Sequence, residues 1–362
     1  MINVTKTYLP NREKFNCYVD QIFESGWLTN NGRVLQELER QLAAYLGVEH
    51  LLLVSNGTLA LQIAYKALGI TGEVLTTPFS FVATTSSLVW ENLTPVFVDI
   101  DPESFNIDPD KLEAAITDRT TAILPVHVFG NACEVEKIDE LAQRRGLKVI
   151  YDAAHAFSVN RNGKSLLNYG DASVLSFHST KIFHTIEGGA IIFKRKEDYE
   201  KACLMINFGI SDYDKVDMLG INCKMNEFQA AMGLCVLSEM DDILEGRKRV
   251  WEKYRAYFTR HGGVALQQLH PGFSDNYAYF PVVLKDEATL LAVKSELNSL
   301  NIYPRRYFYP SLNTLSYLEA TVPCPISESL ASRILCLPLY ADLPAESQEM
   351  ICSIISKHTT EA

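Results

Sequence analysis

The chain has 362 residues, of which 47% are apolar and 21% charged, a composition typical of globular proteins large enough for two domains. Its formal net charge of −11 argues against nucleic acid or an anionic membrane as the main partner. The chain lacks both a secretory signal pattern and an apolar run of the roughly 20 residues that span a bilayer, so we expect a cytoplasmic protein.

The eight cysteines are scattered along the chain, and none of them belongs to a C-x-x-C pair. Isolated thiols are typical of small buried residues in a reducing compartment. Because zinc sites usually contain ligand pairs at close spacing, we predict no metal site.

Strand and helix patterns alternate through the first half of the chain. Apolar residues at helical spacing predict a helix within 36–50 that ends at Gly47. A short buried strand at 51–55 and a helix beginning near Thr58 follow, and residues 72–93 repeat the order of strand, turn and helix.

The alternation continues to about residue 194. The remaining predicted segments are a strand at 94–101, a helix at 108–120, a strand at 122–130, a helix at 134–146, and strands at 147–157, 171–179 and 188–194. Strands alternating with helices predict crossover connections and a mostly parallel sheet with helices on both faces. Ligands of such sheets bind at the carboxyl ends of the strands, where polar residues collect in this sequence.

A long helix is predicted from Asn226 to about Tyr257, with a bend near Gly246. Shorter strands and helices follow it. We therefore predict a large α/β domain over residues 1–240 and a small α+β domain over residues 241–362.

The turn Ser55–Thr58, between a strand and a helix, offers backbone N–H groups at a helix N-terminus beside a hydroxyl group. This arrangement predicts an anion site, although a simple helix N-cap would have the same sequence. The chain contains neither G-x-G-x-x-G nor a Walker motif, which disfavours a nicotinamide-dependent sugar oxidoreductase and a nucleoside triphosphatase.

Two charged residues stand near predicted strand ends. Asp152 follows a buried strand, where a carboxylate needs a cationic or hydrogen-bonding partner, unless it only caps the next helix. Lys181 follows another apolar strand and precedes Gly188 and Gly189, which let the chain turn close to a ligand. A surface lysine is the alternative, but a desolvated lysine with a lowered pKa forms a Schiff base with a carbonyl.

Together these features fit pyridoxal 5'-phosphate. That cofactor needs a lysine for its aldehyde, a carboxylate for its ring nitrogen and an anion cradle for its phosphate. Phe81 in the segment PFSFVAT is in a position to cover one face of the ring.

Six segments carry a resemblance to a known family. They begin GWLTNNGRVLQELE, VSNGTLALQIAY, TTPFSFVATTSS, DAAHAF, SFHSTKIFHTIEGGA and GINCKMNEFQAA. Nearly the whole chain resembles the DegT/DnrJ/EryC1/StrS group of sugar-nucleotide aminotransferases, which have the aspartate-aminotransferase fold (fold type I). The resemblance implies a large α/β domain, with a mostly parallel mixed sheet between helices, and a small C-terminal α+β domain.

The resemblance also implies catalytic roles. Lys181 would hold the cofactor and later move a proton between the substrate and cofactor carbons, and Asp152 would keep the ring nitrogen protonated. His155 stands where many relatives have Gln, and both side chains can donate to the phenolic oxygen of the cofactor. Lys224 replaces an arginine of the family pattern N-x-R-M, so we assign it no phosphate contact.

Further cofactor contacts follow from the same resemblance. Gly57, Thr58 and Ser176 would bind the phosphate, and Phe81 would stack on the ring. Asn222 would reach the phosphate held by the other subunit, so that a homodimer shares its two active sites.

The resemblance implies amino transfer from L-glutamate to a keto-sugar nucleotide. The segment around Lys181 looks closest to enzymes acting at C4 of dTDP-4-keto-6-deoxyglucose, with C3 of a dTDP-3-keto-6-deoxyhexose as the alternative. Family dehydratases carry His in place of the lysine, so Lys181 disfavours that activity. The complete lysine and aspartate set disfavours a non-catalytic cofactor-binding sensor. The aminated sugar would serve lipopolysaccharide O-antigen or another surface glycan.

Candidate substrate contacts are Trp27, Thr29, Asn30, His184, Arg306 and Tyr307. The arginine and the tyrosine of this set suit a pyrophosphate or a sugar hydroxyl, although a solvated basic loop would have the same residues.

Overall fold

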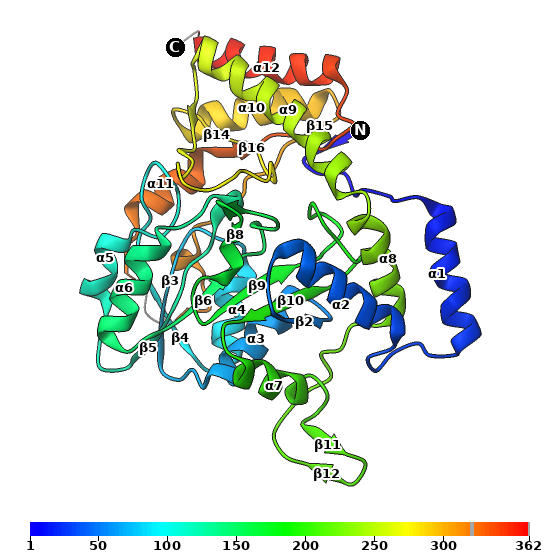
Figure 1. Ribbon diagram of the computed structural model, residues 1–362. Helices are drawn as coiled ribbons and strands as arrows, with labels where there is room; N and C mark the ends of the chain where they lie inside the picture. The colour runs from blue at the N-terminus through cyan, green and yellow to red at the C-terminus, as the bar shows by residue number, and fades with distance from the viewer. Residues whose placement is uncertain (319–321, 361–362) are drawn as a thin grey trace.

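The computed structural model describes residues 1–318 and 322–360. Within them, seven strands form one mixed sheet in the order β2-β10-β9-β6-β5-β3-β4 (Figure 1). Only β10 runs antiparallel to its neighbours. The strands are β2 (His50–Val54), β3 (Glu73–Thr76), β4 (Thr94–Phe97), β5 (Thr120–Leu124), β6 (Lys148–Asp152), β9 (Ala172–Ser176) and β10 (Gly189–Phe193).

Successive residues of a strand point to opposite faces of the sheet. Helices cover both faces of this sheet because the strands carry apolar side chains on both. In β2, Leu51 and Leu53 pack against one set of helices, whereas Leu52 and Val54 pack against the other. The first set is α2 (Arg33–Leu46), α5 (Pro109–Ala115), α6 (Val135–Arg145) and α8 (Glu227–Leu237). The second set is α3 (Gly57–Leu68), α4 (Val82–Trp90) and α7 (Lys196–Met205).

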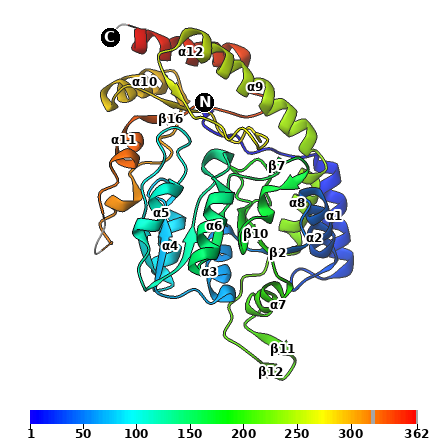
Figure 2. The same cartoon turned by 60° about the vertical axis from the view of Figure 1, so that its left-hand side comes forward.

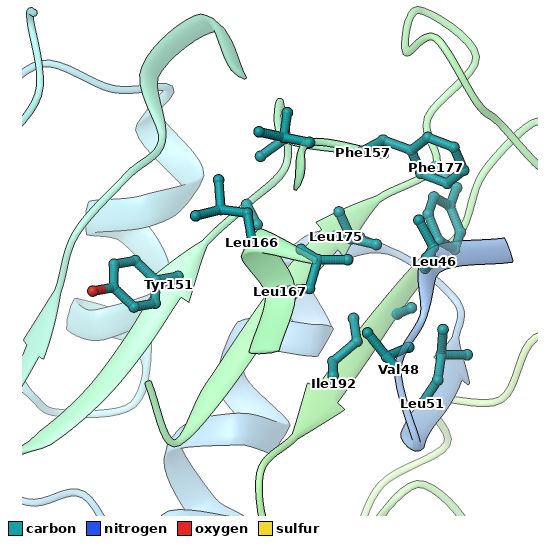
Figure 3. Close-up of a cluster of buried hydrophobic side chains, with 14 of the residues drawn as sticks. Leu46, Val48, Leu51, Tyr151, Phe157, Leu166, Leu167, Leu175, Phe177 and Ile192 are labelled. Carbon is teal, nitrogen blue, oxygen red and sulfur yellow. The ribbon is translucent and has the colours of Figure 1, made fainter. Parts of the chain in front are cut away.

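Figure 3 shows the core on the first face. Leu175 of β9 and Ile192 of β10 point toward Leu46 and Val48, which lie at the end of α2 and in the turn after it. The buried Phe157 and Phe177 lie above them, next to the part of the chain that carries the polar strand ends.

The C-terminal part of the chain packs over one end of the large sheet (Figure 2). It contains a small antiparallel sheet and a hydrophobic cluster separate from the two that flank the large sheet. Its elements are β13 (Ala265–Leu266), β14 (Pro281–Val283), β16 (Ile334–Cys336), α9 (Met240–His261), α10 (Glu287–Ser299), α11 (Pro325–Arg333) and α12 (Ala345–Thr360). The predicted α/β class, with a smaller C-terminal α+β part, is confirmed.

The N-terminus joins this C-terminal part. Strand β1 (Ile2–Asn3) pairs in parallel with β15 (Ile302–Tyr303), and α1 (Arg12–Ser25) then lies against α8 of the large part. The division into 1–240 and 241–362 stays a prediction.

The long helix predicted for 226–257 is two helices, α8 and α9, separated at Ser238 and Glu239. The Glu239 carboxylate accepts hydrogen bonds from the Tyr8 hydroxyl (2.5 Å) and the Asn11 N–H (3.1 Å), so the N-terminal segment is anchored at the break. A bend at Gly246 was the wrong prediction. That glycine lies inside α9, where an added Cβ would stand 2.5 Å from the Ala341 Cβ, so close packing explains it.

The remaining elements are short. They are the hairpins β7–β8 (Asn160–Arg161, Lys164–Ser165) and β11–β12 (Ile210–Asp212, Lys215–Val216) and the 3₁₀ turns Val128–Gly130, Leu166–Asn168 and Leu312–Thr314. The β11–β12 hairpin projects from the end of the molecule opposite α12 (Figure 1). None of the helices among the described residues has the length and apolar character that a membrane span requires.

Gly189, the first residue of β10, offers a test of how tightly the strand ends are packed. It pairs with Val54 on one side and Ser176 on the other, and an added Cβ would stand 2.8 Å from the backbone of Asn56 and of Leu175. We expect Gly189→Ala to cost about 2–3 kcal/mol of stability through overpacking and to lower the melting temperature.

The matched control is Gly47→Ala. This glycine has a φ of +64° and open space around it, so the substitution should cost only about 1 kcal/mol of backbone strain. Thermal unfolding of both variants checks the ranking, and a Gly189→Ala protein at least as stable as Gly47→Ala would contradict it.

Candidate active site

A cavity of about 400 Å³ opens at the carboxyl ends of the sheet strands and is bounded on its other side by the C-terminal part. Asp152 and Ser176 line it from the last positions of β6 and β9, Thr58 from the first turn of α3, which follows β2, and Phe81 from the segment between β3 and α4. Segments far away in the sequence come together here because the parallel strands all end at the same edge.

The amine of Lys181 lies in this cavity and points to the C-terminal part. Its Nζ donates a hydrogen bond of 3.4 Å to the hydroxyl of Tyr279. Burial lowers the pKa of Lys181 to about 8, while the charge of Asp152 acts in the opposite direction. An amine with this pKa is largely neutral in mildly alkaline solution, and the neutral form is the nucleophile and the base.

The Asp152 carboxylate is buried at the end of β6. Its Oδ2 accepts from the Thr84 hydroxyl (2.8 Å) and its Oδ1 accepts from the Ala154 N–H (3.1 Å). Burial raises the pKa of Asp152, and these hydrogen bonds and the charge of Lys181 oppose that rise. Lys181 and Asp152 thus influence each other across the cavity while their direct contacts go to other groups.

The N-terminus of α3 forms a cradle for an anion. The Asn56 side chain caps the helix by accepting from the Leu59 N–H (2.9 Å), and the first-turn N–H groups of Gly57 and Thr58 have no acceptor within the helix. A Cβ at Gly57 would stand 3.0 Å from the Cβ of Ser176. Glycine therefore lets the helix end and the Ser176 hydroxyl lie close together, in an arrangement suited to one anion.

His155 is a neutral hydrogen-bond donor in this site. Its Nδ1 accepts from the Phe129 N–H (3.2 Å), so the ring proton is assigned to Nε2. Burial and the nearby charge of Lys181 keep the pKa of His155 well below its usual value. The rings of Phe129 and Phe308 lie parallel to the imidazole, with interplanar angles of 4° and 5°, and fix its plane.

Phe81 lines the cavity from the N-cap of α4 and is 56% exposed. Tyr307 also lines the cavity. The structure thus brings together eight of the residues singled out from the sequence, which are Gly57, Thr58, Phe81, Asp152, His155, Ser176, Lys181 and Tyr307.

Two predicted substrate contacts have other partners. His184 is 1% exposed, with Nε2 bonded to the Tyr8 carbonyl oxygen (2.7 Å) and Nδ1 accepting from the Ile186 N–H (3.2 Å). Arg306 donates to Glu287 Oε1 (2.6 Å) and to the Ser332 carbonyl oxygen (3.2 Å). The structure brings neither side chain to the cavity wall of its own chain.

Four more predicted contacts lie outside the cavity of their own chain. Asn222 is exposed and pairs through its backbone with Asn207. Trp27 is 54% exposed, and its indole N–H donates to the Asn30 carbonyl oxygen (3.3 Å) in a loop that also contains the exposed Thr29.

Sequence reasoning missed several residues of the site. Thr84 binds Asp152 from α4, and Tyr279, Arg305 and Phe308 form the wall contributed by the C-terminal part. Arg247 of α9 supports that wall by donating to the carbonyl oxygens of residues 277 (2.9 Å) and 278 (2.6 Å). In the sequence, Tyr279 is only one aromatic residue of a strand-like segment, so no local signal marked it.

The strand order, with a low-pKa lysine and a buried aspartate at one edge of the sheet, defines an enzyme of the aspartate-aminotransferase fold. The model of the DegT/DnrJ/EryC1/StrS aminotransferase family matches residues 10–356, and the chain belongs to that family.

Individual relatives are similar over nearly their whole length. The dTDP-4-amino-4,6-dideoxy-D-glucose transaminase of Shigella dysenteriae is 45% identical over 359 residues, covering 98% of each chain. The enzyme of the same name from Escherichia coli is 42% identical and covers 95% of each chain. The crystal structure of DesI with its TDP-sugar product superimposes with a TM-score of 0.93 at 32% identity, covering 99% of this chain and 93% of DesI.

The lowered pKa of Lys181 leads to a direct test. In cofactor-free protein, the acylation of Lys181 should rise with pH to a midpoint of about 8, below the roughly 10.4 of an ordinary lysine. Because the Asp152 charge raises the lysine pKa, Asp152→Asn should move the midpoint lower still. Peptide mass spectrometry after brief labelling measures both midpoints, with solvent-exposed lysines of the same digest as the reference. A midpoint near 10 would mean that the amine is not desolvated.

Proposed function

We propose that this protein uses pyridoxal 5'-phosphate to transfer the amino group of L-glutamate to C4 of dTDP-4-keto-6-deoxyglucose. The observation that carries the proposal is the placement of Lys181 and Asp152 in one cavity, both removed from bulk solvent in large part and neither in direct contact with the other. The choice of sugar rests on the two relatives whose names give a dTDP-4-amino-4,6-dideoxy-D-glucose transaminase activity.

The side chains present fit that cofactor. The α3 cradle with Ser176 suits the phosphate, Asp152 suits the ring nitrogen, His155 Nε2–H suits the phenolic oxygen, and Phe81 suits one ring face. Lys181 would hold the aldehyde carbon. When bound, the cofactor supplies an electron sink for the carbanion left when a proton leaves the substrate carbon.

The chain's own groups then have defined tasks. Once the amino group of the substrate had displaced it from the aldehyde carbon, the free Lys181 amine, neutral in part because burial lowers its pKa to about 8, would take the proton from the substrate carbon and return it on the cofactor side. Tyr279 restrains that amine through its hydroxyl group. Asp152, held in place by Thr84 and the Ala154 N–H, keeps a proton on the ring nitrogen. Glutamate and the keto sugar use the same cavity in turn, so ping-pong kinetics are expected.

The decisive experiment incubates the purified protein with glutamate and a panel of 3-keto and 4-keto sugar nucleotides carrying dTDP, UDP or GDP, and identifies the product by NMR. We expect amination at C4 of the dTDP-4-keto-6-deoxy sugar. Amination at C3 would refute the proposed position, and no amination of any member would refute the activity. An amino sugar nucleotide made in the cytoplasm would serve a surface glycan such as O-antigen.

Asp152→Asn keeps the shape of the side chain and removes its charge. The variant should still bind cofactor through the cradle, but amino transfer should fall at least about a hundredfold because the ring nitrogen loses the group that holds its proton. Turnover is measured together with the cofactor absorbance, so that loss of cofactor is not mistaken for loss of chemistry. Near-normal turnover would rule out this role for Asp152.

We also propose a homodimer with shared active sites. Asn222 lies outside the cavity of its own chain, and apolar side chains are exposed on the neighbouring hairpin region. These side chains are Phe208 (48%), Ile210 (39%), Tyr213 (102%), Val216 (67%), Leu219 (83%) and Ile221 (40%). Apolar surface gathered in this way favours burial against a second copy.

Hybrid dimers test the sharing. Lys181→Ala and Asn222→Ala homodimers should each have both sites impaired. In a hybrid, one site collects both defects and the other is intact, so purified hybrids should approach half of wild-type activity. Size-exclusion chromatography verifies that the hybrids are dimers, and hybrids no more active than the parents would mean that Asn222 serves its own chain.

A further inference from the structure

Arg305 lines the cavity as an exposed residue, and its guanidinium has no carboxylate partner among residues 1–318 and 322–360. Its backbone is fixed: the Arg305 N–H donates to the Cys336 carbonyl oxygen (3.1 Å), and the Cys336 N–H donates to the Arg305 carbonyl oxygen (2.8 Å). Cys336 has no exposed surface, so this anchor belongs to the core. A cation is thus held at the cavity on a rigid base.

The ring of Tyr307 orients this cation. The Arg305 guanidinium carbon lies 5.3 Å from the centroid of the Tyr307 ring, within the range in which an aromatic face attracts a cation. A guanidinium that stacks on a ring keeps its in-plane N–H donors free for a second partner.

The adjacent arginine is used differently. Arg306 is bonded to Glu287 and stacks on Tyr309, with its guanidinium carbon 3.5 Å from the ring centroid. Its charge is therefore compensated within the C-terminal part, whereas that of Arg305 is not. Of the two neighbours, only Arg305 is available to a ligand in the cavity.

A series of side-chain contacts connects Arg305 with the reactive amine. Lys181 Nζ lies 3.4 Å from the Tyr279 hydroxyl, and the ring centroids of Tyr279 and Tyr307 lie 5.8 Å apart. Arg305 stacks on the far member of that pair. Both residues line the same cavity, so a substrate that reacts at Lys181 can place an anion remote from the reacting atom at Arg305.

We propose that Arg305 is the residue that recognises the substrate's remote anion, binding a pair of carboxylate or phosphate oxygens through its in-plane N–H groups. This inference rests on the proposed function, whose two substrates both carry such a group. Glutamate has its side-chain carboxylate, and the sugar nucleotide has its diphosphate. Bidentate, charge-assisted hydrogen bonds of a guanidinium suit either group.

The test compares Arg305→Met with wild type by calorimetry and steady-state kinetics of the cofactor-loaded enzyme. One arm measures the binding of 2-oxoglutarate and the KM for glutamate, and the other measures the binding of dTDP and the KM for the keto-sugar nucleotide. We expect Arg305→Met to weaken binding in one arm at least about tenfold, with a much smaller change in kcat. The affected arm identifies whether the anion is the carboxylate or the diphosphate. Arg305→Lys, which keeps the charge but loses the fork of donors, should recover part of the loss.

Two further variants make the result specific. Arg255 also stacks on an aromatic ring, with its guanidinium carbon 5.1 Å from the Trp251 centroid, but it does not line this cavity, so Arg255→Met is the matched control. We expect it to leave both arms within twofold of wild type. Arg306→Met tests the competing assignment, and a loss of affinity in that variant with none in Arg305→Met would overturn the inference.

The inference and the proposed function fail in different ways. If the nucleotide-sugar panel shows no turnover, the function fails, while the two ligand-binding arms still measure the contribution of Arg305. If the panel shows turnover but Arg305→Met binds both ligands and uses both substrates within twofold of wild type, the inference is wrong and the function stands. Absence of binding of both ligands to wild-type protein would also overturn the inference.

Discussion

The site depends on a partly buried lysine and a buried aspartate that share one cavity without an ion pair. Lys181 is held by Tyr279, and Asp152 is held by Thr84 and the Ala154 N–H. A direct ion pair would stabilise the charged form of each group, and neither group would then be available to a ligand. Their separation leaves the amine with a lowered pKa and the carboxylate without a cationic partner in direct contact, and together these groups suit a flat cationic ring placed between them.

The surrounding structure maintains this separation. Parallel strands bring the ends of β6 and β9 next to each other, and the tight contact of Gly57 with Ser176 places the anion cradle beside them. The opposite wall comes from the C-terminal part, where Arg247 supports the segment that carries Tyr279. Because the amine lies between the two parts, a change in how they pack would alter both its hydrogen bond and its desolvation.

Packing also determines which of two residues of the same type has a side chain available to the cavity. Arg305 and Arg306 have the same side chain, yet one faces the cavity and the other is paired with Glu287. His184 and His155 are both buried imidazoles, but the two ring nitrogens of His184 bind backbone groups, whereas His155 keeps a donor for the cavity. Residue type alone does not distinguish the members of such pairs.

The sequence by itself determined the alternation of strands and helices, and hence the sheet and the edge at which polar residues gather. It also singled out Lys181, Asp152 and the turn before α3, because each stands next to a strand whose apolar pattern is local and readable. Only the tertiary structure decided the second wall of the cavity, the choice of Arg305 over Arg306, and the break between α8 and α9 at Glu239. Those features depend on contacts between residues far apart in the chain, such as Glu239 with Tyr8 and Arg305 with Cys336, which no local pattern encodes.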